Sequence, residues 1–429
     1  MVMLRCAIVQ RFLSGRLYML RIAIIGTGIS GLGAASLLHP SHDITVYEKS
    51  SVIGGHTRTL QVNGTAVDTG FIVYNERNYP LLTKLFRHLD VKTQPSNMTF
   101  GVTTEGGALE WGAENLNAVF GQRGNIVNPR FWKFLCDILR FNRQAERKSA
   151  QNPGVTLGEL ARAMGMGDWF LNYYLLPMGG AIWSCSLDDM LAFPADLFVS
   201  FFKAHGLLTV TQQPKWRTVT GGSREYVARL TAPFRDRILT SRAATAITRD
   251  NGIRVTDSTG ETRDYDRLVL ACHAGEALAL LQDATPQERE TLGAFHYRSN
   301  RAFLHSDASL MPKRRRCWSS WVYHATDAAG PVSVTYWMNQ LQSLDDKKPL
   351  FVTLNPPRPI APELVHDEHV FEHPVYTVEA FSAQKKLPAI QGTRNTWYCG
   401  AYHRNGFHED GLASAVDAAR LMGAEAPWR

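Results

Sequence analysis

Arg21-Ile22-Ala23-Ile24-Ile25-Gly26-Thr27-Gly28-Ile29-Ser30-Gly31 is the stretch that decides the fold of this chain. It predicts a buried β-strand, a tight glycine turn and the start of a helix. Gly26 can adopt the turn, Gly28 leaves its main chain open to a pyrophosphate, and Gly31 allows the helix to pack closely on the strand. The first N–H groups of the helix would then face the phosphates. We therefore expect Gly26, Gly28, Ile29, Ser30 and Gly31 to bind a dinucleotide.

A second strand, Asp43-Ile44-Thr45-Val46-Tyr47, leads to Glu48, which lies 22 residues after Gly26. At this spacing a carboxylate binds the ribose of a dinucleotide. An ordinary strand–helix–strand unit without a ligand is the alternative, but the acid makes the dinucleotide site the favoured interpretation. These first motifs suit NAD and FAD equally well.

The composition narrows the class of protein. With 429 residues the chain has room for two or more domains. Its six cysteines and 14 histidines show no metal-ligand or redox spacing, so we expect no metal site, and free thiols in a reducing, cytoplasmic compartment. A net charge of +7 suits an anionic cofactor or membrane surface. No nucleic-acid module is recognisable, and nucleic acid is not expected as a partner.

Residues 1–19 stand apart from the rest of the sequence. They resemble a signal or transit peptide only vaguely, because charged residues interrupt the apolar runs well below the length of a membrane span. The first strand follows at once, without a linker. We interpret 1–19 as an extension or a misassigned start, with Met19 as the natural initiator.

Two interleaved domains are predicted. Residues 20–95, 215–280 and 390–429 carry the glycine turns and short buried strands of a Rossmann-like α/β domain. Residues 96–214 and 281–389 combine amphipathic helices with alternating aromatic strands, which predicts an α+β domain containing an antiparallel sheet. Its segment 169–208 is unusually rich in aromatic and large apolar residues, and suits either an apolar tunnel or an ordinary core.

Four separated motifs resemble those of the two-dinucleotide-binding-domain flavoproteins of the amine oxidase and phytoene desaturase superfamily. They are the Gly26–Gly31 turn with Glu48; Gly54-Gly55-His56-Thr57; Gly221-Gly222 with strands near Ala244 and at 268–272; and Trp397-Tyr398-Cys399-Gly400-Ala401 followed by Gly411-Leu412. The resemblance covers nearly the whole chain. It implies FAD as the cofactor and an FAD-binding domain interleaved with the substrate domain. In the family the final helix directs its N-terminus toward the flavin.

Longer segments resemble one bacterial subgroup of predicted NAD/FAD-binding proteins. They are residues 67–76, 176–184, 336–339 and 406–412. The subgroup is associated with methyltransferases that resemble cyclopropane-fatty-acid synthases, and includes the flavin-dependent desaturase of furan fatty acid biosynthesis. By analogy, this chain would desaturate a methyl-branched unsaturated fatty-acyl or phospholipid-acyl chain by hydride transfer to flavin N5. The implied partners are a lipid or acyl-chain substrate and a lipid methyltransferase.

The resemblance also implies cofactor contacts beyond the first turn. Lys49 is assigned to a phosphate, because Val52 stands where many relatives carry arginine. In many relatives an acid near the final flavin motif binds the ribitol or phosphate of FAD. Here Gly400-Ala401 stands at that point, which puts this contact in doubt. The implied contacts are Glu48, Lys49, Gly54, Gly55, His56, Thr57, Thr69, Gly70, Phe71, Ile72, Ala244, Gly400, Gly411 and Leu412.

Candidates for the chemistry lie beside these motifs. The catalytic candidates are His56, Tyr74, His403 and His408. Structural roles are the alternative for the histidines, and Asp410 is expected to be the N-cap of a helix that begins near Gly411. The substrate wall is expected to include Tyr173, Trp183 and Tyr336.

Two other functions stay open at this point. One is a flavin amine oxidase acting on a small amine, which an acid-lined pocket would favour. The other is a non-catalytic flavin-binding partner of a lipid methyltransferase. The run Lys313-Arg314-Arg315-Arg316, followed by Trp318 and Trp321, suggests peripheral contact with the inner face of a membrane, although a solvated loop is the favoured interpretation of so short a run.

Overall fold

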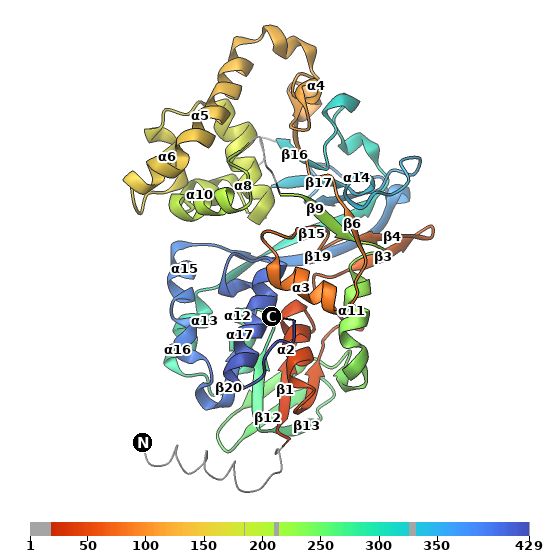
Figure 1. Ribbon diagram of the computed structural model, residues 1–429, viewed down its shortest axis with the longest axis vertical. Helices are drawn as coiled ribbons and strands as arrows, with labels where there is room; N and C mark the ends of the chain where they lie inside the picture. The colour runs from red at the N-terminus through yellow and green to blue at the C-terminus, as the bar shows by residue number, and fades with distance from the viewer. Residues whose placement is uncertain (1–18, 184, 210–213, 326–331, 429) are drawn as a thin grey trace.

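A five-stranded parallel sheet organises the lower half of the molecule in the computed structural model, which describes residues 19–183, 185–209, 214–325 and 332–428 (Figure 1). The strand order is β10–β2–β1–β14–β20. The strands are β1 (Arg21–Ile25), β2 (Asp43–Tyr47), β10 (Ile238–Leu239), β14 (Arg267–Leu270) and β20 (Thr396–Tyr398). All their pairings are parallel, so their carboxyl ends meet at one edge. The predicted Rossmann-like domain is confirmed.

Helices cover both faces of this sheet. One face carries α2 (Ile29–Leu38), α3 (Pro80–His88), α11 (Arg224–Thr231) and α17 (His408–Leu421). The other carries α12 (Ala274–Leu280), α13 (Pro286–Gly293), α15 (Val378–Gln384) and α16 (Leu387–Ile390), beside the small sheet β11 (Ala244–Thr248), β12 (Ile253–Asp257) and β13 (Thr262–Tyr265). Because both faces are covered, the central strands β1 and β14 are apolar and buried at every position after their first residue, which is an arginine in each.

A seven-stranded sheet, antiparallel except for the β16–β7 pair, forms the centre of the upper half. In spatial order its strands are β19 (Val365–Val375), β15 (His296–His305), β18 (Phe351–Leu354), β17 (Ser333–Trp337), β16 (Trp321–Ala325), β7 (Phe100–Thr104) and β8 (Glu110–Gly112). The predicted antiparallel sheet is confirmed. The long strands β15 and β19 lie where the two halves of the molecule meet (Figure 1).

Helices complete the upper half. They are α4 (Leu116–Val119), α5 (Pro129–Gln151), α6 (Leu157–Ala163), α7 (Asp168–Phe170), α8 (Leu176–Trp183), α9 (Leu187–Ala192), α10 (Ala195–Ala204) and α14 (Met338–Gln342). Among them, α4, α8 and α14 contact the sheet. Helix α5 begins with Pro129 in its first turn, where the missing N–H of proline costs no hydrogen bond, and ends at Gln151. A π-helical turn, Leu171–Leu175, joins α7 to α8. Such turns are frequent at functional sites.

Short sheets connect the two halves. They are β3 (Thr59–Val62) with β4 (Thr65–Asp68), and β5 (Tyr74–Asn75) with β9 (Trp216–Val219) and β6 (Thr93–Pro95). Ala380 and Leu387, from the predicted substrate segment 281–389, pack in the core beside the parallel sheet. The domain boundaries stay a prediction.

Two expectations concern the membrane and the N-terminus. Among the described residues, no helix has the length and apolarity needed to cross a membrane. The expectation about residues 1–19 falls outside the described part of the chain, apart from Met19.

Candidate active site and cofactor cradle

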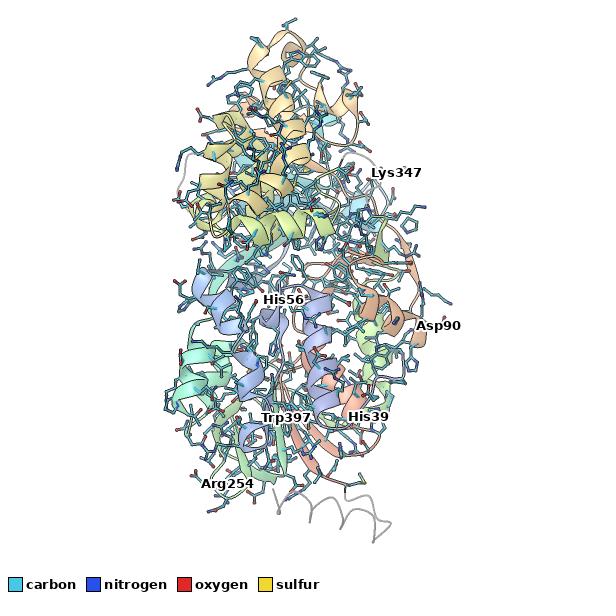
Figure 2. All side chains as sticks on the ribbon, turned by 60° about the vertical axis from the view of Figure 1, so that its left-hand side comes forward. His39, His56, Asp90, Arg254, Lys347 and Trp397 are labelled. Atoms are coloured by element: carbon cyan, nitrogen blue, oxygen red, sulfur yellow. The ribbon has the colours of Figure 1, made fainter. Side chains whose placement is uncertain are left out.

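A continuous cavity of about 2090 Å³ runs from the carboxyl edge of the parallel sheet into the upper half. Pockets for small molecules measure about 300–1,000 Å³, so this cavity has room for a dinucleotide and a second molecule. Glycine turns form its lower end, histidine and aromatic rings its middle, and helices α5 and α8 part of its upper end. His56 lies in the middle, where the two halves meet (Figure 2).

The lower end is built by two glycine turns that touch each other. A Cβ on Gly55, where φ is +58°, would lie 3.0 Å from the Cα of Gly28. At Gly26 φ is +105°, and a Cβ would lie 2.9 Å from the carbonyl oxygen of Ala271. By contrast, a Cβ on Gly28 would meet no heavy atom of the described residues within 4 Å. Open space at the N-terminus of α2 is what a pyrophosphate requires.

Glu48 lies beside this turn, as its predicted ribose role requires. Its Oε2 accepts a hydrogen bond from the backbone N–H of Thr27 at 3.1 Å, and its Oε1 accepts one from Ser50 N–H at 2.8 Å. The carboxylate is buried and held at the cavity wall.

Lys49 and Arg235 are cationic residues at this end of the cavity. The Nζ of Lys49 lies 2.7 Å from Oε1 of Glu276 on α12, so the predicted phosphate ligand already has an acidic partner. Arg235, in the turn that follows α11, also lines the cavity. The sequence did not point to Arg235, because this residue lies in no recognisable motif.

The final helix closes the cradle against α2. A Cβ on Gly411 would lie 2.8 Å from Cγ2 of Ile29 and 2.8 Å from Oγ of Ser30. The N-termini of α2 and α17 therefore open at the same cavity, where Phe407 and His408 form part of the wall. Two positive helix ends and the open space at Gly28 fit the anionic dinucleotide expected from the sequence, FAD.

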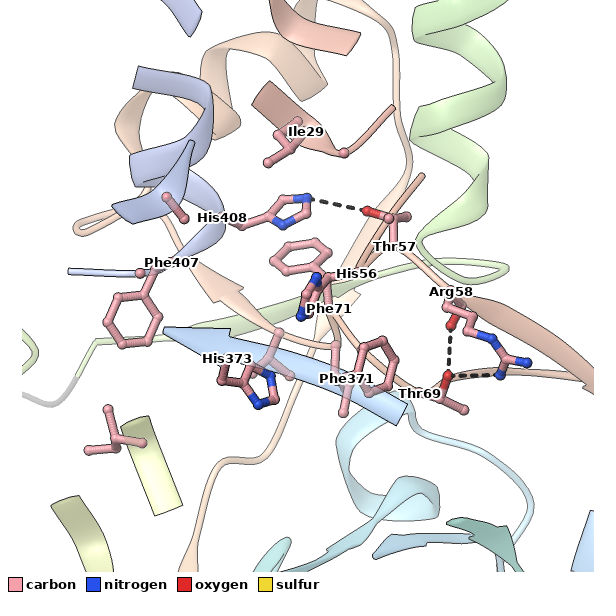
Figure 3. Close-up of a pocket in the computed structure, with 18 of the residues that line it drawn as sticks. Ile29, His56, Thr57, Arg58, Thr69, Phe71, Phe371, His373, Phe407 and His408 are labelled. Atoms are coloured by element: carbon pink, nitrogen blue, oxygen red, sulfur yellow. Dashed lines mark hydrogen bonds between the residues drawn. The ribbon is translucent and has the colours of Figure 1, made fainter. Parts of the chain in front are cut away.

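Histidine and phenylalanine rings surround the middle of the cavity (Figure 3). The ring of His56 lies 5.0 Å from that of Phe371 and 5.3 Å from that of His373, which sit two residues apart on β19. These β19 residues were missed in the sequence. The available signal was the alternation of His369, Phe371 and His373, which places three rings on one face of a strand.

His408 is the first residue of α17 and is held on several sides. Its Nε2 lies 2.6 Å from the hydroxyl of Tyr226 and 3.4 Å from Oγ1 of Thr57, and its ring stacks on Phe71 at 4.0 Å (Figure 3). Burial lowers the pKa of His408 to about 3. Burial, with a smaller effect of nearby histidines, also holds the pKa of His56 well below its usual value. Both imidazoles are therefore neutral near pH 7.

The two carboxylates that follow His408 have structural partners. Glu409 accepts hydrogen bonds from the N–H groups of Leu81 and Leu82 at 2.8 and 2.9 Å, and so caps the N-terminus of α3. Asp410 is not the N-cap that we predicted, because α17 starts at His408 with Phe407 in the cap position. The Oδ2 of Asp410 instead accepts from Phe407 N–H at 3.0 Å, from inside the first turn.

Asp410→Asn should change how folding stability depends on pH. Burial raises the pKa of Asp410 from 3.8 to about 6. A raised folded pKa means that this carboxyl contributes stability below about pH 4, and that the contribution is lost as the pH rises through 6. The uncharged amide does not titrate, so the stability of the variant relative to the wild type should rise by roughly 3 kcal/mol between acidic and neutral pH. Denaturant unfolding of both proteins at several pH values measures the difference; parallel pH curves would contradict it.

Most predicted cofactor contacts line the cavity. They are Gly26, Gly28, Ile29, Ser30, Glu48, Lys49, Gly55, His56, Thr57, Thr69, Gly70, Phe71, Ile72, Ala244 and Gly400. Gly31, Gly54, Gly411 and Leu412 lie behind the wall. A Cβ on Gly31, for example, would lie 1.9 Å from the carbonyl oxygen of Gly26. These residues allow the turns and helices to pack together.

The structure separates the four catalytic candidates. His56 and His408 line the cavity. Tyr74 lies outside its wall, because β5 pairs with β9 and the Tyr74 ring packs edge-on against Tyr79 and Phe86 in the core. His403 also lies outside the wall, in the turn before α17, where burial lowers its pKa to about 4.

The upper end of the cavity is largely apolar. Its walls include Leu135, Ile138 and Leu139 of α5, Met178, Ala181, Ile182 and Trp183 of α8, and Trp111, Trp321 and Tyr336 of the sheet. Of the three predicted wall residues, Trp183 and Tyr336 belong to it. Tyr173 packs against Trp169 outside the wall, and its neighbour Tyr174 lines the cavity instead. We call this region the apolar chamber.

The carboxylates on the described cavity wall all have partners. Besides Glu48 and Glu276, they are Glu114, which accepts from Nδ2 of Asn97 at 3.4 Å, and Glu372, which accepts from the hydroxyl of Ser299. None of the wall residues on α5 or α8 is acidic. Of these acids Glu276 is paired with a cation, Lys49, whereas the described walls on α5 and α8 offer no acid to an ammonium group.

Comparisons with known proteins agree with this architecture. The model of the family described as flavin containing amine oxidoreductase matches residues 29–422. The "Putative flavin-containing monoamine oxidase AofH" of Mycobacterium tuberculosis is 23% identical over 353 residues, 78% of this chain and 70% of that protein. The 4,4'-diapophytoene desaturase of Staphylococcus aureus is 36% identical over 52 residues, 12% of this chain and 10% of the desaturase. The crystal structure of the CLA-producing fatty acid isomerase from P. acnes has a TM-score of 0.66 at 16% identity, covering 96% of this chain and 99% of that one.

Proposed function

The chain belongs to the flavin-containing amine oxidoreductase family, and on that premise we propose that it desaturates a methyl-branched unsaturated fatty-acyl or phospholipid-acyl chain. It is an FAD-dependent oxidoreductase. The bound flavin supplies the hydride acceptor. The chain's own residues hold the cofactor at the glycine turns, exclude water and orient the acyl chain above it.

One observation carries the choice of an acyl substrate. The cavity continues from the cofactor cradle into the apolar chamber, whose described walls on α5 and α8 carry no acid. An acyl chain is bound through shape and buried apolar area rather than through charge. His56 and His408 line the same cavity as neutral imidazoles, so neither adds a fixed charge that the chain must pass.

A flavin amine oxidase acting on a small amine is the second candidate. The match to the M. tuberculosis protein, whose name refers to monoamine oxidation, favours it. The aromatic rings of Trp111, Tyr174, Trp321 and Tyr336 line the chamber, and aromatic faces attract cations. Against it stands the absence of acidic residues from the described chamber walls on α5 and α8.

A lipid methyltransferase is the partner that we propose. The methyl branch of the substrate must be installed before the chain is desaturated. The methyltransferase would therefore act first. The third candidate function also involves this methyltransferase. In that case the chain would be a flavin-binding subunit of the methyltransferase, without chemistry of its own.

Anaerobic reduction of the purified protein distinguishes the three candidates. We expect about one FAD per chain, and loss of its visible absorbance when a methyl-branched unsaturated acyl lipid is added. The same lipid without the methyl branch is the matched control. Reduction by a small amine but not by lipid would select the amine oxidase, and reduction by neither would leave the non-catalytic subunit. A protein that takes up no FAD would overturn the cofactor assignment as well.

A further inference from the structure

Exposed apolar side chains concentrate at one end of the molecule. Of the ten large apolar side chains that are strongly exposed among the described residues, five lie between residues 116 and 139. They are Leu116 (77% exposed), Ile126 (49%), Val127 (84%), Trp132 (48%) and Leu139 (51%), and we call them the α4–α5 patch. Helices α4 and α5 occupy the top of the view in Figure 1, at the end opposite the parallel sheet.

The segments that carry the patch are tied together. The indole Nε1 of Trp132 donates to the carbonyl of Ile126 at 2.8 Å, and its ring lies 5.3 Å from Phe120, which directly follows α4. Arg123 donates to the carbonyl of Phe120 at 2.9 Å. Helix α4, the turn at 123–127 and the first turns of α5 therefore form one connected surface.

The patch is continuous with the apolar chamber. Leu116 and Leu139 belong to both, because each lines the cavity and has more than half of its surface exposed. Leu135, Ile138 and Asn142 continue the cavity-facing side of α5, at helical spacing from Leu139. The cavity thus reaches the surface at the patch.

Positive charge predominates around the patch. Residues 113–148 include seven Lys or Arg residues, at 123, 130, 133, 140, 143, 147 and 148, against three acids, at 114, 137 and 146. The buried Asp137 is bound by Lys133 and Arg140 at 2.8 Å each, so one acid is already neutralised within the fold. Arg123 and Arg130 are exposed beside the apolar side chains.

The basic run that suggested membrane contact in the sequence is largely used within the protein. Lys313 donates to the carbonyl of Gly106 at 2.7 Å, and Arg314 pairs with Glu110 at 2.8 Å. The guanidinium of Arg315 lies over the rings of Trp318 and Trp337. Arg316 adjoins the patch, since a Cβ on Gly121 would lie 3.4 Å from its Cβ. The run therefore adds to the charge beside the patch but is not the apolar contact itself.

We propose that the α4–α5 patch docks on the surface of an anionic phospholipid bilayer and that the cavity opens there to take up an acyl chain. Apolar side chains bordered by cations match a bilayer interface, where the former enter the acyl boundary and the latter meet anionic head groups. The excess of positive charge favours a bilayer over a protein partner. The uptake of a chain rests on the proposed function, whereas docking rests on the patch alone.

Flotation of the FAD-loaded protein with vesicles tests the docking. We expect the wild type to float with mixed phosphatidylcholine–phosphatidylglycerol vesicles and much less with phosphatidylcholine alone. The double variant Val127→Glu, Trp132→Glu should lose binding by about fivefold or more. The matched control Val378→Glu, Leu421→Glu changes two exposed apolar residues elsewhere, 62% and 59% exposed, and should bind like the wild type.

The outcomes separate this proposal from the proposed function. Arg123→Glu with Arg130→Glu provides a second patch variant, and the FAD content of each variant reports whether it has folded. Binding of both patch variants at the wild-type level, or absence of wild-type binding, would overturn the docking. Loss of flavin reduction by lipid in vesicles, but not by lipid in detergent micelles, in the patch variants would support it. Vesicle binding without flavin reduction in either medium would keep the docking and reject the desaturase function.

Discussion

Gly28→Val should raise the dissociation constant of FAD by at least about 100-fold and leave the fold of the apoprotein intact. The residue has φ −65°, which any amino acid adopts, and a Cβ there meets no heavy atom of the described residues within 4 Å. The added methyl groups would instead occupy the space in which the N-terminus of α2 meets a pyrophosphate. A hundredfold change corresponds to about 2.7 kcal/mol, a loss expected when charge-assisted hydrogen bonds are broken.

Gly31→Val is the matched control with the opposite expectation. A Cβ at Gly31 would lie 1.9 Å from the carbonyl oxygen of Gly26, so this variant should fail to fold rather than fold without FAD. Fluorescence titration of the apoproteins with FAD measures binding, and circular dichroism measures the fold. Wild-type affinity in Gly28→Val would place the pyrophosphate elsewhere in the cavity.

Ile182→Trp should lower kcat/KM for the acyl substrate by about 100-fold without changing the FAD content. Ile182 lies on α8, lines the apolar chamber and is partly buried. An indole there would fill a section of the chamber that an extended chain needs, and a loss of transition-state binding of about 2.7 kcal/mol gives this rate effect.

Ile182→Leu keeps the volume and should stay close to the wild-type rate. A small amine would need only part of the chamber, so amine turnover, if present, should be much less sensitive to the indole. Comparing the effect of Ile182→Trp on kcat/KM for an acyl substrate and for a small amine therefore shows whether the substrate occupies the chamber. Unchanged turnover of the acyl substrate by Ile182→Trp would contradict the assignment of the chamber.

The nucleotide-binding half of the fold could be predicted because its signals are local. The turn at Gly26–Gly31 and the acid at Glu48 lie within one strand–helix–strand unit, and their spacing reflects the geometry of that unit. The parts of the cavity wall that come from segments distant in the sequence could not be predicted in this way. Phe371 and His373 reach His56 only because β19 lies at the junction of the two halves.

Two expectations about the site differ from the structure, one in the direction of a side chain and one in the start of a helix. Tyr74 comes shortly after the predicted cofactor contacts Thr69 to Ile72, yet the pairing of β5 with β9 turns its ring into the core. For Asp410 the helix start was misplaced by three residues, because a carboxylate can accept from the same N–H groups from the cap or from the first turn. Such choices depend on tertiary packing, which sequence distance does not report.

The contact of Gly411 with Ile29 and Ser30 has a consequence for the synthesis of the protein. It joins a helix that leaves the ribosome early to a helix that follows it only after the whole of the second domain has been made. The nascent chain therefore lacks a complete cradle until α17 has emerged, and FAD cannot be fully bound before that point. A chain cut short before α17 would remain without cofactor, with the apolar surface of α2 uncovered, and would become a substrate for chaperones or proteases.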